Sequence, residues 1–299
     1  MRVLRQHDRM AQMARPSPNP LPTREGFWLH AGPIDLLCRA WGDPAAVEAA
    51  EGAARRVFPA ILPTLCQELP HLRTELPSLP PRGVIARAMH RAVAPYTAGF
   101  ITPMAAVAGA VADHVLAAMT AAAPLAKAFV NNGGDIAFHL AADQSLRCGL
   151  VTDLVVPTLD GAFLLHASSP SRGIATSGRA CKGRGGKSFS LGIADAVTVL
   201  ARSAAAADAA ATVISNAVDL PGHPSIERRP AHDIDPDSDL GARLVTWDVG
   251  ALSRIEISKA LDAGRLVAEG LRRAGLIDGA VLALHGTLVT CLDPVLEAA

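Results

Sequence analysis

Apolar and polar residues alternate along residues 26–41, GFWLHAGPIDLLCRAW, as they do in strands with one buried face. Gly32 and Pro33 interrupt the alternation, so we expect a hairpin with its turn at these two residues. The segment KAFVNNGGDIAFHLA at 127–141 has the same form of strand, tight turn and strand. Further strands are expected at 147–156, 162–166, 196–201, 243–249 and 280–286, the last of which should close the sheet.

Apolar residues at helical spacing mark a second set of segments. One begins after Asp43, which can cap the helix while Pro44 takes its first position, and it continues to residue 69. Another begins at Pro103 with Thr102 as its cap, and its small residues would let a backbone or a ligand approach closely. The remaining helices are expected over residues 83–94, 203–217 and 252–274.

Hairpins and helices are interleaved along the chain without the strict alternation of a doubly wound parallel protein. This order predicts an α+β fold with antiparallel or mixed sheets and packed helices. Residues 23–299 are expected to form a single domain. Residues 1–22, which contain the stretch PSPNPLP, are expected to be a disordered N-terminal tail.

Composition and charge exclude several classes of partner. Lysine plus arginine equals aspartate plus glutamate at 28 residues each, so no net charge attracts nucleic acid or an anionic membrane. The apolar region from Pro103 to Val130 contains charged residues, which favours a buried helix over a membrane span. The five cysteines lack CxxC or zinc spacing and no secretory signal is evident, so we expect a cytoplasmic protein. An alanine-rich surface would suit a homodimer.

The segment GIATSGRACKGRGGKS at 173–188 is typical of a loop that combines hydroxyl groups, glycines and cations. Such a loop offers the groups that a phosphate-bearing ligand requires, and the alternative is a solvated basic loop. It is not a P-loop, because Cys181 stands where the motif GxxxxGK[ST] requires glycine. The candidate phosphate contacts are Thr176, Ser177, Gly178 and Ser188.

Asp208 and Thr212 lie four residues apart in the helix expected at 203–217, so their side chains share one helix face. A carboxylate and a hydroxyl group in this arrangement could bind a hard cation such as Mg²⁺. The alternative is a solvated aspartate beside a threonine that bonds back to its own helix. All residues from 204 to 211 except Asp208 are alanine. This composition places the carboxylate on an easily buried surface, which favours a bound cation.

The segment NNGGDI at 131–136 supports two interpretations. Asn and Gly are the usual residues of a β-turn, so the segment could serve only to connect two strands. The second glycine also makes an anion-receptive backbone, beside which an aspartate could bond a ring or a sugar. The candidate ligand contacts here are Asn132, Gly133, Gly134 and Asp135.

Three segments, NNGGDI, IATSGR at 174–179 and ADAAATVISNAV at 207–218, resemble motifs of the ApbE-type FAD:protein FMN transferases in order and spacing. With TPMAAVAGAVAD at 102–113 and SFSLGIADAVTVLA at 188–201, the chain resembles more closely an uncharacterised bacterial and archaeal branch of that superfamily. The resemblance covers roughly residues 26–290. It implies that Asp208 and Thr212 bind magnesium on the FAD pyrophosphate, with Gly133, Gly134 and Asp135 beside the flavin nucleotide.

The chain departs from this family at two motifs. The N-terminal motif with Met-Gly-Thr and the histidine followed by Asp-Pro are both missing, and Lys187 precedes Ser188 where the uncharacterised branch usually has histidine. Lysine and histidine differ in unperturbed pKa, about 10.4 against about 6.5, so the two are not equivalent in proton transfer. Lys187 and Asp195 are the candidate catalytic residues.

The resemblance thus implies a magnesium-dependent protein that binds FAD, or a related flavin nucleotide, and acts at its pyrophosphate. In the transferase form, a hydroxyl group of an acceptor protein would be the partner. Two alternatives stay open: a flavin-binding or carrier protein without catalysis, and an enzyme that acts on another nucleotide or a pterin-like molecule.

Overall fold

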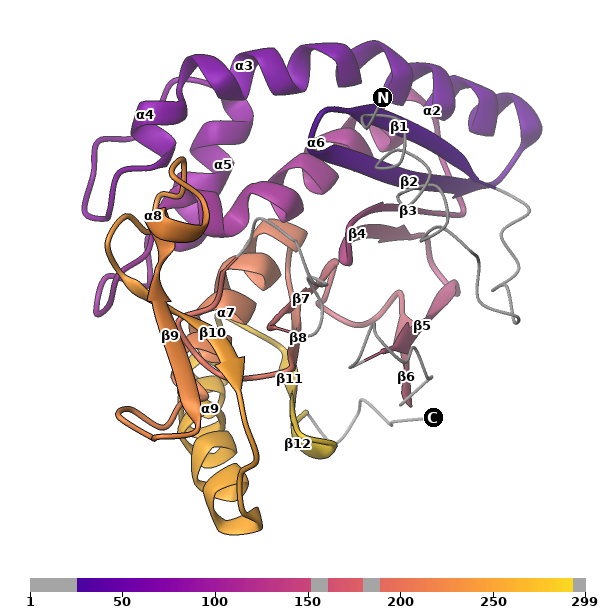
Figure 1. The fold of residues 1–299 in the computed structure, drawn as a ribbon. Helices are drawn as coiled ribbons and strands as arrows, with labels where there is room; N and C mark the ends of the chain where they lie inside the picture. Colours follow the sequence, from indigo (N-terminus) through magenta and orange to yellow (C-terminus); the bar gives the residue numbers. More distant parts are fainter. Residues whose placement is uncertain (1–25, 152–160, 180–188, 293–299) are drawn as a thin grey trace, which may run out of the picture.

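The computed structural model describes residues 26–151, 161–179 and 189–292 (Figure 1). The expected tail at 1–22 and the candidate residues Lys187 and Ser188 lie outside these ranges. The architecture is α+β, as expected, and every strand pair in the described part of the chain is antiparallel.

The largest sheet has eight strands in the order β1-β2-β3-β4-β7-β8-β11-β12. Its centre is buried: all six residues of β8 and all six of β11 are buried, and eleven of these twelve are apolar or glycine. The strands are β1 (Phe27–Ala31), β2 (Ile34–Trp41), β3 (Lys127–Asn132), β4 (Asp135–Leu140), β7 (Gly173–Ser177), β8 (Ala196–Ala201), β11 (Gly279–Leu284) and β12 (Thr287–Cys291).

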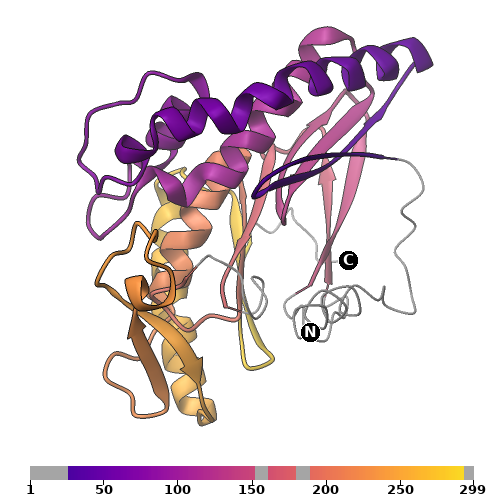
Figure 2. The same cartoon turned by 45° about the horizontal axis from the view of Figure 1, so that its top comes forward.

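Helices cover one face of this sheet, and a small hairpin lies on the other side (Figures 1 and 2). The main core lies beneath the helices α2 (Pro44–Val57), α5 (Val84–Val93), α6 (Val107–Ala122), α7 (Ala204–Ala217) and α9 (Arg254–Arg273). The hairpin of β5 (Ser145–Leu150) and β6 (Gly161–His166) covers a second, smaller core. That core includes Phe138 of β4, Leu200 of β8 and Val281 of β11, so the centre of the sheet is buried on both faces.

Helix α7 contacts α6 very closely, and small residues permit this. A Cβ atom added at Gly109 of α6 would lie 2.3 Å from the carbonyl oxygen of Ala204. The space expected beside the small residues of this helix is therefore occupied by the backbone of α7. Asp113, one turn further along α6, accepts hydrogen bonds from the backbone N–H groups of Ala204 (3.0 Å) and Ala205 (2.9 Å). Burial raises the pKa of the Asp113 carboxyl group, and these N–H groups oppose the shift.

Several predicted elements require correction. The segment expected as one helix over 44–69 is divided into α2, the 3-10 turn η1 (Phe58–Ala60) and two short helices, α3 (Ile61–Gln67) and α4 (Leu69–Leu72). The strand expected at 243–249 forms β10 (Leu244–Val249), which pairs with β9 (Ile226–Pro230) outside the main sheet. The strand at 280–286 is followed by β12, so it does not close the sheet.

The helix that begins at Pro103 opens with the 3-10 turn η2 (Pro103–Ala106), and the Thr102 side chain caps it as expected. By length and composition alone, the stretch Pro103–Ala122 could cross a membrane, which is weak evidence because core helices meet the same criterion. In the fold, α6 contacts α2 and α7 and lies over β3 and β4. Its residues Val111, Val115 and Met119 are fully buried, as in a core helix.

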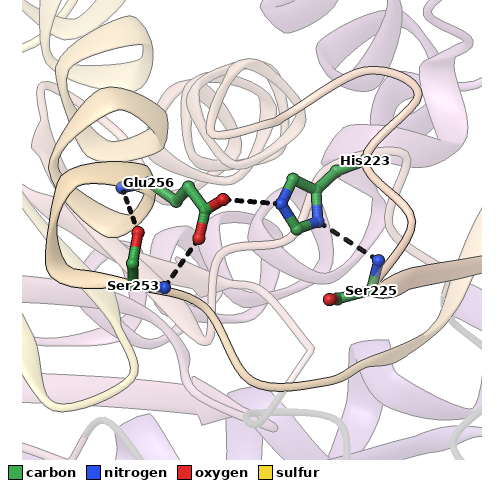
Figure 3. A network of polar contacts seen from close by, with 4 residues as sticks. All are labelled: His223, Ser225, Ser253 and Glu256. Atoms are coloured by element: carbon green, nitrogen blue, oxygen red, sulfur yellow. Dashed lines mark hydrogen bonds and ion pairs between the residues drawn. The ribbon is translucent and has the colours of Figure 1, made fainter.

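A polar network joins the start of α9 to the segment that follows α7 (Figure 3). Ser253 and Glu256 form a capping box, in which each side chain accepts a hydrogen bond from the other residue's backbone N–H. The ring nitrogen Nε2 of His223 lies 2.9 Å from Glu256 Oε1, and Nδ1 accepts from the N–H of Ser225. The His223 contact and the capping box lower the pKa of Glu256 to about 2.

Candidate functional site

The β3–β4 turn is built from Gly133 and Gly134, whose φ angles are 66° and 108°. The amide oxygen of Asn131 accepts a hydrogen bond from the N–H of Gly134 at 2.8 Å, which closes the turn. A Cβ atom added at either glycine would meet none of the described residues within 4 Å. The turn therefore has open space beside its backbone, and both interpretations of NNGGDI remain compatible with the geometry.

The first turn of α6 brings two predicted site residues together. The Asn132 side chain donates to the carbonyl oxygen of Ala108 at 3.1 Å. The N–H of the next residue, Gly109, donates to Asp208 Oδ2 at 3.0 Å. Because Ala108 and Gly109 are consecutive, the β3–β4 turn and the carboxylate on α7 lie at one place in the fold, although 76 positions separate Asn132 from Asp208 in the sequence.

Asp208 and Thr212 occupy one face of α7, as expected, and both are half-buried. Thr64 and Thr120 bond back to carbonyl groups of their own helices. The Thr212 hydroxyl, in contrast, has no hydrogen bond to any residue in the described part of the chain. In the described part of the chain Thr212 therefore does not bond back to its helix, and the binding of a ligand by its oxygen stays a prediction.

The donor set suits a hard cation. Carboxylate and hydroxyl oxygens are magnesium ligands, and Mg²⁺ commonly binds one or two protein groups together with water and phosphate oxygens. Within the described ranges no three His, Cys, Asp or Glu side chains gather as a metal cluster. The residues present therefore fit a cation that is completed by a phosphate ligand and water, and they do not fit one that is held entirely by protein side chains.

The segment at 173–177 is strand β7, which corrects the expectation that 173–188 begins as a loop. The Thr176 hydroxyl lies 2.9 Å from the Thr198 hydroxyl of β8, and the Thr176 N–H donates to Asp135 Oδ1 at 3.2 Å. Ser177 is buried, with 6% of its surface exposed. Both hydroxyl residues thus lie within the sheet, and Asp135 links the β3–β4 turn to β7. Their role as phosphate contacts stays a prediction.

Asp195 and Gly178 lie together at the end of the sheet where β7 ends and β8 begins. A Cβ atom added at Gly178 would lie 2.3 Å from the Asp195 carbonyl oxygen, so the two backbones are in contact. Asp195 Oδ2 accepts a hydrogen bond from the N–H of His285 at 2.6 Å. His285 occupies the β11–β12 turn with a φ of 46°, and not a strand interior as its sequence suggests.

Arg179 adds a cation at the same end of the sheet. Its guanidinium nitrogen Nη2 lies 3.7 Å from Asp248 Oδ1. Burial lowers the pKa of Arg179, while the charges of Asp195 and Asp248 oppose that shift. The sequence marks Arg179 only as one of several loop cations, and nothing in it pairs that residue with β10. Asp195 therefore stands in a charged cluster, and its catalytic role stays a prediction.

These features define a class: an antiparallel α+β protein in which a glycine turn and a helix-borne Asp/Thr pair converge. The chain matches the family described as AbpE bacteria over residues 19–290 and belongs to it. The ApbE-like resemblance, in an uncharacterised branch with archaeal relatives, is thereby confirmed.

Two archaeal relatives are both described as UPF0280 protein. The one from Methanospirillum hungatei is 34% identical over 173 residues, which cover 57% of this chain and 67% of the relative. The one from Methanosarcina acetivorans is 32% identical over 209 residues, which cover 69% of this chain and 78% of the relative. Matches to several other relatives span about half of the relative's length.

A solved structure shares the fold. It is a mutant of the flavin transferase ApbE from Vibrio cholerae, with a TM-score of 0.51, 10% sequence identity, and coverage of 92% of this chain and 96% of that one. At this identity the likeness concerns the fold alone.

Proposed function

We propose that this protein binds a flavin nucleotide, with FAD as the leading ligand, through a Mg²⁺ ion held by Asp208 and Thr212. The observation that supports this most is the convergence of the Asn132 and Asp208 side chains on consecutive residues of α6. A turn with open space beside its two glycines and a carboxylate–hydroxyl pair would there contact one ligand from two sides. The pyrophosphate would bind the cation, and the nucleotide would lie along the β3–β4 turn.

The proposed chemistry is phosphoryl transfer at the pyrophosphate of FAD. A hydroxyl group of an acceptor protein forms a new bond to the FMN phosphorus, the bond to the AMP phosphate oxygen breaks, and AMP leaves. The bound cation would act as a Lewis acid for the charge that develops on the phosphate oxygens. Asp195 is the described residue proposed to take the hydroxyl proton, and the nearby Arg179 cation would favour its ionised form.

Substitutions at the Asp/Thr pair test the binding proposal. FAD binding is measured by fluorescence quenching with and without Mg²⁺. Asp208→Asn retains an oxygen that accepts from the Gly109 N–H but removes the charge, so it should abolish the effect of Mg²⁺ while the fold persists. Thr212→Val should weaken Mg²⁺-dependent binding about ten-fold, as expected for one lost metal ligand or charged hydrogen bond.

Thr120→Val is the matched control, because it makes the same chemical change in α6, where the hydroxyl only bonds back to its own helix. It should leave FAD binding unchanged. FAD binding that is indifferent to Mg²⁺, or that survives Asp208→Asn intact, would overturn the proposal.

Release of AMP separates a transferase from a carrier. The protein is incubated with FAD, Mg²⁺ and a hydroxyl-bearing acceptor protein, and AMP is quantified by chromatography. AMP formation that Asp195→Asn reduces at unchanged FAD affinity supports transfer. Tight FAD binding without AMP formation supports a flavin-binding or carrier protein. Tighter binding of a pterin than of FAD supports an enzyme that acts on another nucleotide or a pterin-like molecule.

A further inference from the structure

A pocket lies at the opposite end of the main sheet from Asp195. Its volume is about 380 Å³, and Arg202, which follows the last residue of β8, lines it together with Arg272 of α9. Asp195 directly precedes β8 and Arg202 directly follows it, so the length of this strand, about 20 Å, lies between Asp195 and the pocket. None of the described residues proposed to bind FAD or Mg²⁺ lines it.

Two unpartnered guanidinium groups dominate the charge of this pocket. Neither Arg202 nor Arg272 forms an ion pair or side-chain hydrogen bond with any residue inside the described ranges. The Nε atom of Arg272 is buried and lacks a hydrogen-bond partner there. Buried polar atoms are normally paired, and an unpaired one costs stability, so this atom indicates a missing acceptor.

Among the described residues that line the pocket, Asp278 carries the one carboxylate, and it does not serve as that acceptor. Its Oδ2 atom accepts a hydrogen bond from the Ser171 hydroxyl at 2.7 Å. Since His166 is the other titratable group among the described lining residues, these residues together carry at least one excess positive charge. Arginine side chains are well suited to bind the oxygens of phosphate.

The wall that carries the hydroxyl groups is held rigidly. The Arg172 guanidinium donates to the carbonyl oxygens of Ala167 (2.9 Å), Ser169 (2.6 Å) and Ser171 (2.6 Å), so one side chain fixes the loop between β6 and β7. Ser168 and Ser169 of this loop line the pocket. Such a preformed wall loses little entropy when a ligand binds.

We propose that this pocket binds the phosphate group of a small organic phosphate. Arg202 and Arg272 contact the phosphate oxygens, and the Ser168 hydroxyl is placed to donate to them. Leu164 and Ile277, which also line the pocket, contact the apolar body of the ligand. The site is separate from the proposed flavin site and is independent of Mg²⁺ at Asp208.

Phenyl phosphate is a suitable probe because it combines a phosphate group with a compact apolar ring. Binding to the full chain is followed by calorimetry at low salt, where charged contacts are least screened. Inorganic phosphate tests the anion alone and phenol tests the ring alone. We expect phenyl phosphate to bind more tightly than either.

Arg272→Gln and Arg202→Gln should each weaken the binding of phenyl phosphate by about ten-fold or more, as expected for lost hydrogen bonds to a charged group. Arg273→Gln is the matched control, because Arg273 is the next residue of α9, is exposed, and does not line the pocket. Arg202 is also exposed, so its substitution keeps the test valid if Arg272→Gln impairs folding.

Asp208→Asn should leave the binding of phenyl phosphate unchanged, which separates this site from the proposed flavin site. Affinity that is equal in the wild type, both pocket variants and the Arg273 control would overturn the proposal. Loss of binding in Asp208→Asn would also overturn it, since the phosphate would then occupy the metal site.

Discussion

Gly109 sets the distance between α6 and α7, and Gly109→Ala tests whether this contact positions the candidate site. The added methyl group would lie 2.3 Å from the Ala204 oxygen, 2.4 Å from its carbonyl carbon and 2.7 Å from the Ala205 nitrogen. All three are main-chain atoms, so no side-chain rotation relieves the overlap. Overpacking of this kind costs about 1–3 kcal/mol, against which alanine gains about 1 kcal/mol in helix propensity.

Gly270→Ala provides the matched control. Gly270 lies inside α9, where an added Cβ atom meets no described residue within 4 Å. This variant should therefore gain only the stabilisation of about 1 kcal/mol from the higher helix propensity of alanine. The difference between the two variants then isolates the overlap, at about 1–3 kcal/mol, or roughly 2–5 °C in Tm for a chain of this size. Gly109→Ala should also weaken Mg²⁺-dependent FAD binding, because the Gly109 N–H bonds Asp208.

The assay is thermal unfolding of both variants and the wild type, followed by FAD titration at a temperature where all three are folded. Equal Tm values for the two alanine variants would refute the packing argument. A destabilised Gly109→Ala variant that retains full FAD affinity would support the packing argument, but it would contradict the expectation that the α6–α7 contact positions the candidate site.

Two further predictions concern single polar groups. Asp113→Ala removes the acceptor for two N–H groups at the start of α7 and should lower the free energy of unfolding by about 2 kcal/mol in urea titrations; an unchanged midpoint would contradict this. The pKa of Glu256 is lowered to about 2, so its contribution to stability is present above its unfolded pKa and is lost as the pH falls toward 2. The Tm difference between wild type and Glu256→Gln should therefore be present at pH 5–7 and smaller at pH 3, and a difference that stays constant would oppose this.

The sequence predicts elements well where local signals determine them. Asp43 caps α2, and the residues predicted as the strand at 196–201 are those of β8. The prediction fails where the structure depends on contacts with residues that are distant in the sequence. The five residues of β7 are followed by glycine and resemble a loop, and they form a strand because β4 and β8 pair with them on either side. The helix expected over 44–69 is divided because prolines occur inside the predicted range.

In the candidate site, too, the sequence predicts the features that local spacing determines and misses those that long-range contacts determine. The i and i+4 spacing of Asp208 and Thr212 determines their shared helix face, so the sequence predicts that face correctly, and their metal binding stays a prediction. It does not predict that the N–H of Gly109 occupies one Asp208 oxygen, because that contact joins two helices 99 residues apart. Arg202 and Arg272 are likewise ordinary surface cations in the sequence, and only the fold places them in one pocket.

The buried alanines of α7 restrict which substitutions this helix can accept. Ala207, Ala209, Ala210 and Ala211 have no exposed surface, so larger side chains at these positions would displace neighbouring elements. The β3–β4 turn is restricted for a different reason: there is space beside Gly133 and Gly134, but their φ angles of 66° and 108° would strain any other residue. Paralogues would then keep both the alanines of α7 and the two glycines of the turn, and would vary elsewhere.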